Sequence, residues 1–215
     1  MQPDQVPMPA GVAARPRDAR GYPVLAISPW RDGVPVFAVT SPHRILVCAV
    51  ERRCSICGLG LGTGPVWRVV GADEAAAIAE HPAAFANAAR TVEPPGHRAC
   101  MLYAVVVCPW LARPNARRHL GAQVVGLEVA RGDSRGAVGE VGGAVVSYRT
   151  YDFTAGERVE LRYHDVVDFL PHLLGEEHLR ALEEATTGED LPTDVCPPWL
   201  LSDEVAAQRR AQRYL

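Results

Sequence analysis

Two short pairs of metal-ligating residue types constrain this chain more than any other feature of its sequence. Cys54 and Cys57 are separated by two residues, and so are His97 and Cys100. Three sulfur ligands and one imidazole suit a tetrahedral zinc site, in which two closely spaced pairs meet around one ion. Because two paired motifs are more specific than either alone, we predict a Zn²⁺ site made of Cys54, Cys57, His97 and Cys100.

The residues around the two pairs predict their local structure. Residues 58–60 read Gly-Leu-Gly and predict a tight turn that presents both sulfurs to one side. Residues 94–96 read Pro-Pro-Gly and predict a helix that begins near His97, which places His97 and Cys100 on one face. A knuckle followed by a strand or hairpin and a helix start is a treble-clef-like arrangement. The 39 residues between Cys57 and His97 leave room for the hairpin and an inserted helix.

A redox pair, or two simple core thiols, is the alternative for Cys54 and Cys57. A thioredoxin-like pair would open a helix directly after a strand, whereas glycines follow here. Under the zinc interpretation, three thiolates and Zn²⁺ leave one net negative charge, which we expect Arg52, Arg53 and Arg98 to offset. Structural zinc sites of this kind contribute on the order of 10 kcal/mol to folding.

The remaining cysteines lie outside this set. Cys48 falls in the apolar part of a predicted helix and is expected in the core. Cys108 follows Cys100 at a distance of about 12 Å along a helix, too far to bind the same ion. We expect Cys108 to be a buried thiol; the alternatives are a reactive thiol or, with Pro109, a thiolate ligand to haem. Cys196 precedes two prolines, which predicts an exposed thiol in a turn.

Composition and charge disfavour several classes of protein. The formal net charge is −3, whereas proteins that coat nucleic acid are usually strongly basic. Nucleic-acid binding is therefore expected only through local arginine patches, such as Arg113, Arg117 and Arg118 beside His119, which could instead bind a phosphate or a carboxylate. The sequence has no run of about 20 apolar residues for a membrane span. It also has no hydrophobic signal region near the N-terminus, so we expect a cytoplasmic protein.

The other histidines are weaker candidates for chemistry. His164 and Asp165 follow a predicted strand, but neighbours on a strand point to opposite faces, so an acid–base pair is a minor alternative. His172 and His178 are expected on a helix surface. The GxxxxGK[ST] loop, the dinucleotide fingerprint and GxSxG are absent. The strand after the knuckle also lacks the His and Asn of a His-Asn-His nuclease.

The chain is predicted to fold as an α+β protein, with the treble-clef-like zinc site in its N-terminal half and a small antiparallel sheet with C-terminal helices. Residues 1–20, rich in Pro, Ala and Arg, predict a mobile arm. Residues 21–120 form the zinc-site region. Residues 121–215 form an α+β part that we expect to pack on the same core.

Local patterns predict the elements of the first region. Two short strands, residues 23–28 and 35–39, flank a turn at residues 31–33. A helix is predicted to begin after Ser41, with Pro42 in its first turn. Residues 65–70 predict a strand, and Asp73 is expected to cap an Ala-rich helix.

The second region is predicted to contain strands at residues 122–130, 144–153 and 158–163. A helical stretch is expected from His164 to Thr187. A final helix is expected after Ser202, its predicted N-cap.

Four motifs resemble those of a family of small uncharacterised proteins of actinobacteria and their phages. They are Arg-Gly-Tyr-Pro at residues 20–23, the knuckle at 54–58, Pro-x-His-x2-Cys at 95–100, and Cys-Pro-Trp-Leu at 108–111. The resemblance covers about residues 20–115 and implies the same four zinc ligands. It draws attention to Cys108-Pro109 and implies no particular activity. The Ala-rich insert at residues 73–90 departs from the simplest members.

Two functions from different classes fit these observations. The first is a binding or regulatory module in which zinc stabilises the fold and the surface binds a protein, a small molecule or a second copy of the chain as a homodimer. The alternative is a small enzyme of bacterial specialised metabolism, with a structural or ligand-exchangeable zinc and a pocket near Cys108, His119 and His164. A haem protein is a third, weaker interpretation.

Overall fold

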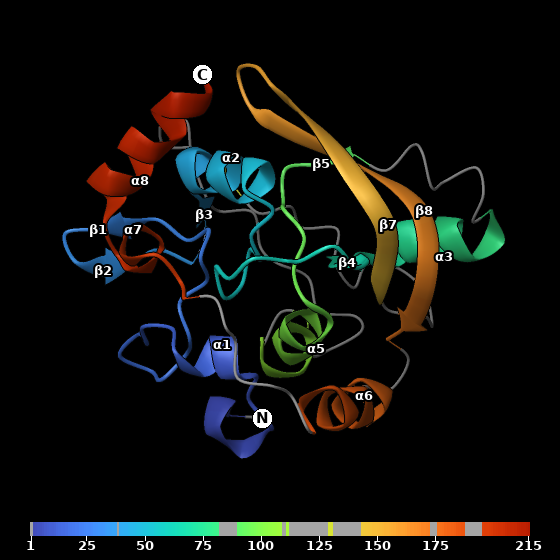
Figure 1. Cartoon of the computed structure of the whole chain (residues 1–215). Coiled ribbons are helices and arrows are strands. Elements are labelled where there is room, and N and C mark those ends of the chain that lie inside the picture. The colour runs from blue at the N-terminus through green and yellow to red at the C-terminus, as the bar shows by residue number, and fades with distance from the viewer. Residues whose placement is uncertain are drawn as a thin grey trace.

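The computed structural model mixes helices with small antiparallel sheets, in agreement with the predicted α+β class (Figure 1). The structure describes residues 2–37, 39–81, 90–108, 111, 129–130, 143–172, 176–187 and 195–215. The C-terminal part of the chain contains helices, as predicted.

The largest sheet is antiparallel and has the strand order β4-β7-β8-β5. Its strands are β4 (Val66–Val70), β5 (Arg90–Thr91), β7 (Ala144–Ala155) and β8 (Val159–Pro171). Strands β7 and β8 form a long hairpin that curves across one side of the molecule (Figure 1). The strands predicted at residues 65–70, 144–153 and 158–163 are therefore confirmed.

Strand β8 continues through residues that were expected to be helical. The helix predicted from His164 is wrong as far as Pro171, because these residues pair with β7 and place Leu170 opposite Val145 and Phe169 opposite Val146. β-branched and aromatic side chains suit such a pleated surface, and cross-strand packing outweighs a weak helical pattern. The helix of this region is α6 (Glu176–Thr186), which begins only after the strand has ended.

Two smaller sheets each contain two very short strands. β1 (Trp30–Arg31) and β2 (Val34–Pro35) flank Asp32 and Gly33, whose φ angles of 50° and 77° are those of a tight hairpin turn. The predicted turn is confirmed, but the strands beside it are shorter than expected and displaced. β3 (Val39–Thr40) pairs with β6 (Val129–Ala130), and the rest of the strand predicted at 122–130 lies outside the described residues.

The helices follow most of the predicted start signals. Ser41 caps α2 (Pro42–Val50) by accepting a hydrogen bond from the backbone N–H of Arg44, as predicted. The cap of α3 (Ala72–Glu80) is Gly71 and not Asp73, and the cap of α8 (Glu204–Ala211) is Asp203 and not Ser202. The other helical elements are α5 (Arg98–Val107), α7 (Pro198–Leu201) and the 3₁₀ turn η2 (Gln212–Tyr214).

The segment expected to be a mobile arm contains local structure and buried side chains. It forms the 3₁₀ turn η1 (Pro3–Gln5) and the short helix α1 (Ala10–Ala13). Val6, Val12 and Arg15 are buried. The segment is held because Arg15 donates hydrogen bonds to residues far along the chain.

Both halves of the chain contribute to one cluster of buried side chains, in which Leu102 of α5, Val146 of β7 and Leu182 of α6 are all included. Helix α5 contacts β4, β7 and α6, and therefore lies at the centre of the packing. Among the described helices, none is long and apolar enough to span a bilayer.

Candidate metal centre

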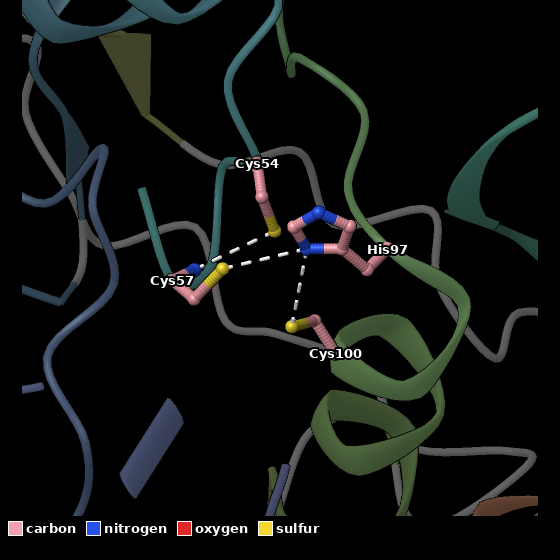
Figure 2. A group of neighbouring side chains, drawn as sticks. All are labelled: Cys54, Cys57, His97 and Cys100. Atoms are coloured by element: carbon pink, nitrogen blue, oxygen red, sulfur yellow. Dashed lines mark hydrogen bonds between the residues drawn. The ribbon is translucent and has the colours of Figure 1, made fainter. Parts of the chain in front are cut away.

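The four predicted ligands meet in one cluster. The Sγ atoms of Cys54, Cys57 and Cys100 and a ring nitrogen of His97 all lie within 4.8 Å of one another. The three cysteines are buried, and His97 is partly exposed. Figure 2 shows the two knuckle cysteines on one side and His97 and Cys100 on the other, with their ligand atoms converging.

The spacing of these atoms fits a metal ion. The Nδ1 atom of His97 lies 3.4 Å from Sγ of Cys57 and 3.8 Å from Sγ of Cys100. In a tetrahedral zinc site, bond lengths of about 2.3 Å to sulfur and about 2.0 Å to nitrogen place a sulfur and a nitrogen ligand about 3.5 Å apart. The cluster therefore has the dimensions of a four-coordinate metal site.

Backbone hydrogen bonds shape the knuckle. The N–H of Cys54 donates to the Leu59 carbonyl at 2.8 Å, and the N–H of Gly58 donates to the Cys54 carbonyl at 2.9 Å. The N–H groups of Ile56 and Cys57 point to Sγ of Cys54 at 3.4 and 3.5 Å. Such N–H groups stabilise a thiolate, and the φ angle of +81° at Gly58 allows the chain to turn this tightly.

The second pair lies at a helix start, as predicted. His97 is the N-cap residue of α5, and Cys100 lies in the first turn. The chain before the helix is fixed because the N–H and C=O of Gly96 bond to the backbone of Trp67 in β4, at 2.8 and 3.0 Å. A Cβ atom at Gly96 would lie 2.9 Å from Sγ of Cys54, so this glycine permits the close approach of the two halves of the site.

The ring of His97 is oriented by a second hydrogen bond. Its Nε2 lies 2.9 Å from the carbonyl oxygen of Gly60, which can only accept, so Nε2 carries the proton. When the imidazole is neutral, the Nδ1 atom therefore has a free lone pair on the side of the three sulfurs, where an ion could bind. Metal-bound histidines are commonly held in this way.

In the metal-free protein, the pKa values of the clustered residues shift in different directions. Burial alone would lower the pKa of His97, but hydrogen bonds from Cys54 and Cys57 raise it to about 11. Burial would raise the pKa of Cys54, whereas hydrogen bonds from Cys100, Cys57 and His97 bring it well below its usual value. The pKa of Cys100 is raised because it is hydrogen-bonded to Cys54 and Cys57 and buried. A metal that binds all four groups as thiolates and neutral imidazole must displace these protons.

The three arginines expected to offset the negative charge of the proposed zinc site make different contacts. Arg53 donates to the Gly58 carbonyl at 3.2 Å, so it contacts the knuckle. Arg52 lies 5.4 Å from the centre of the Tyr151 ring, and Arg98 lies 5.6 Å from that of Trp67, in cation–π contacts. Of the three, Arg53 is the one whose side chain donates to the knuckle, and the charge balance itself stays a prediction.

The N-terminal segment covers the knuckle, which the sequence did not indicate. A Cβ atom at Gly11 of α1 would lie 3.3 Å from Sγ of Cys57 and 2.8 Å from Cδ1 of Leu59. From the same segment, Arg15 reaches Cys196, 181 positions later, at 3.2 Å. No local pattern signals a contact between residues so far apart in the sequence.

The other cysteines differ in environment. Cys48 is fully buried, as predicted, and Cys108 is half-buried at the C-terminal end of α5. The prediction of an exposed thiol at Cys196 is wrong, because Cys196 is buried against Gly58 and Arg15. Pro109, Arg113 and Arg117–His119 lie outside the described residues.

The histidines of the C-terminal region also differ from expectation. His164 pairs with Asp152 across the β7–β8 hairpin at 2.9 Å, rather than with its neighbour Asp165. His172 and His178 were expected on a helix surface but are buried, with Nδ1 atoms 2.7 Å apart and stacked rings. His172 directly follows β8 instead of lying on a helix, whereas His178 lies on helix α6 as expected but is buried there.

Neither protein-family models, nor curated proteins, nor solved structures match this chain. The functional argument therefore depends on the geometry of the cluster. Four protein ligands that surround one point can hold a metal ion and fill its coordination sphere.

Proposed function

We propose that this chain is a zinc protein in which Cys54, Cys57, His97 and Cys100 hold a structural Zn²⁺ ion and the remaining surface serves binding or regulation. The observation that carries the proposal is the convergence of four ligand atoms within 4.8 Å of one another in a largely buried position. Thiolate and imidazole ligands favour zinc over the hard cations, which prefer oxygen.

A closed ligand set favours a structural role over a catalytic one. Catalytic zinc usually has three protein ligands and one open position for water or substrate. Here four protein groups are available to one ion, and the backbone around Cys54 and Gly96 joins the knuckle to β4 and α5. An ion at this point would cross-link the centre of the core.

The treble-clef-like arrangement belongs to the same proposal. Its two ligand-bearing parts are a knuckle at Cys54–Cys57 and a helix start at His97–Cys100, with β4 between them in sequence. Arg53 and Gly60, on either side of the knuckle, form a β-bridge, as the two arms of a short hairpin would. The family resemblance of these motifs is consistent with this arrangement and remains a prediction.

The enzyme alternative requires a pocket with convergent polar groups. Of the residues on which it was based, His119 lies outside the described part of the chain. His164 lies on the hairpin with Asp152, and Cys108 ends α5. Because these two residues occupy separate elements and neither adjoins the Cys54 cluster, we favour the binding or regulatory module.

Metal analysis of the purified full chain tests the proposal. We expect about one zinc per chain, and replacement by Co²⁺ should give the intense visible bands of a tetrahedral thiolate site. Cys57→Ser should lose most of the bound metal and destabilise the fold, whereas Cys108→Ser, the matched control, should retain both. A wild-type chain without metal, or a Cys57→Ser variant with full metal content, would contradict the proposal.

A further inference from the structure

Arg15 is a buried cation without a carboxylate partner among the described residues. Its side chain is 3% exposed. Nε donates to the Val24 carbonyl at 2.7 Å, and Nη1 donates to the Leu200 carbonyl at 2.9 Å and to Sγ of Cys196 at 3.2 Å. These partners are neutral, and Nη2 is buried with no hydrogen-bond partner in the described structure. A guanidinium stays charged in a protein, so its charge requires compensation from elsewhere.

A second buried arginine nearby increases the need for a negative charge that compensates Arg15. Arg44 is fully buried and donates to the same Leu200 carbonyl at 3.0 Å, so the two guanidinium groups lie close together. Arg44 forms an ion pair with Glu204, which balances one of the two charges. Arg15 is therefore the member of this pair that has no anionic partner among the described residues.

The neighbouring thiol does not supply the missing charge. Burial raises the pKa of Cys196, and Arg15 only partly opposes this effect, so Cys196 stays a neutral thiol. Cys196 instead lies between Arg15 and the knuckle. Its Sγ is 2.7 Å from the position that a Cβ atom on Gly58 would occupy. Gly58 directly follows Cys57, one of the candidate ligands.

We propose that the metal–thiolate centre is the counter-charge of Arg15, so that this residue of the N-terminal segment strengthens zinc binding without touching the ion. The inference rests on the proposed zinc site, in which three thiolates and Zn²⁺ carry one net negative charge. The N-terminal segment brings Gly11 against Cys57 and Arg15 against Cys196, which itself packs on Gly58, so the positive charge lies on the side of the knuckle that the segment covers.

If Arg15 is paired with the zinc centre, metal binding also affects the contacts between segments that Arg15 holds together. Its hydrogen bonds join the segment after α1 to Leu200 of α7 and to Cys196. Zinc occupancy therefore stabilises the contact between two segments that lie 185 positions apart.

The test compares zinc affinity in four full-length chains: wild type, Arg15→Gln, Arg15→Lys and Arg17→Gln. Arg17 lies two residues away and is exposed, so its variant controls for net charge alone. Opposite charges about 10 Å apart, at an effective dielectric constant of about 20, change a binding constant by about tenfold. Competition with a chromophoric chelator should show zinc binding weakened by about this factor in Arg15→Gln, while Arg15→Lys and Arg17→Gln stay close to wild type.

The lysine variant separates charge from hydrogen bonding. It keeps the positive charge but loses the planar guanidinium group, which donates hydrogen bonds to the carbonyls of both Val24 and Leu200. Equal weakening by Gln and Lys would overturn the inference in favour of a purely structural role, and so would unchanged affinity in Arg15→Gln. If Arg15→Gln does not fold, weak zinc binding by a folded Arg15→Lys variant is still decisive against the inference. Absence of zinc from the wild type would instead reject the zinc site itself.

Discussion

The Nε2 atom of His97 lies 2.9 Å from the carbonyl oxygen of Gly60, so the knuckle orients the histidine that completes the four-residue cluster. The bond directs Nδ1 to the sulfurs of Cys57 and Cys100 (Figure 2). The two parts of the cluster are therefore positioned by each other as well as by their own secondary structure.

Replacement of His97 by Ala should weaken zinc binding by at least about tenfold, since losing a ligand costs more than losing a residue that only supports one. The measurement is the zinc dissociation constant of the purified chain. His81→Ala is the matched control, because His81 is exposed at the end of α3. Equal affinity in the two variants would show that the imidazole is not a ligand.

Gly58→Ala should destabilise the protein more than Gly62→Ala. Both glycines have positive φ angles, +81° and +65°, so each substitution carries the left-handed backbone cost of about 1–2 kcal/mol. Only at Gly58 would the new Cβ meet another atom, Sγ of Cys196 at 2.7 Å, which adds about 1–3 kcal/mol of overpacking. Urea unfolding of both variants measures the difference. Equal losses would mean that Cys196 moves aside freely.

Glu204→Gln should lower the free energy of unfolding by about 2 kcal/mol, because it leaves the fully buried Arg44 without its anion. The figure is below that of a fully buried pair because the Glu204 side chain is 29% exposed. Glu184→Gln on α6 is the exposed control. A loss no larger than that of the control would indicate that Arg44 is neutralised by another group.

Acid should destabilise the fold through His178. Burial lowers the pKa of His178 below its usual 6.5, although its bond to the Leu170 carbonyl opposes this shift. The unfolded chain then binds a proton more readily than the folded one, so this contribution to stability is present above pH 6.5 and is lost as the pH falls towards the folded-state pKa.

The His178 effect is measured as a difference between two proteins, because the clustered cysteines and His97 also change protonation with pH. Urea unfolding of wild type and His178→Gln at neutral pH and at mildly acidic pH gives the two slopes. We expect the wild type to lose more stability than the variant over this interval. Parallel slopes would show that His178 does not contribute.

The sequence predicted those parts of the protein that local patterns determine. The ligand pairs and the Ser41 cap depend on residues a few positions apart, and both follow the prediction. The segment from His164 to Pro171 could not be assigned in this way, because its state depends on pairing with β7. Likewise, the burial of Arg15 and Cys196 depends on a contact between opposite ends of the sequence.

Cys196 and Leu200 cover one side of the knuckle, and they are synthesised late. This order affects how a metal ion could reach the cluster. All four ligands leave the ribosome before Cys196 and Leu200, the residues that pack on Gly58. A growing chain can therefore capture an ion while one side of the centre is still open to the surroundings. Once the last helices dock, Cys196 and Leu200 cover the knuckle at Gly58, so an ion held by the cluster would be shielded from the surroundings on this side.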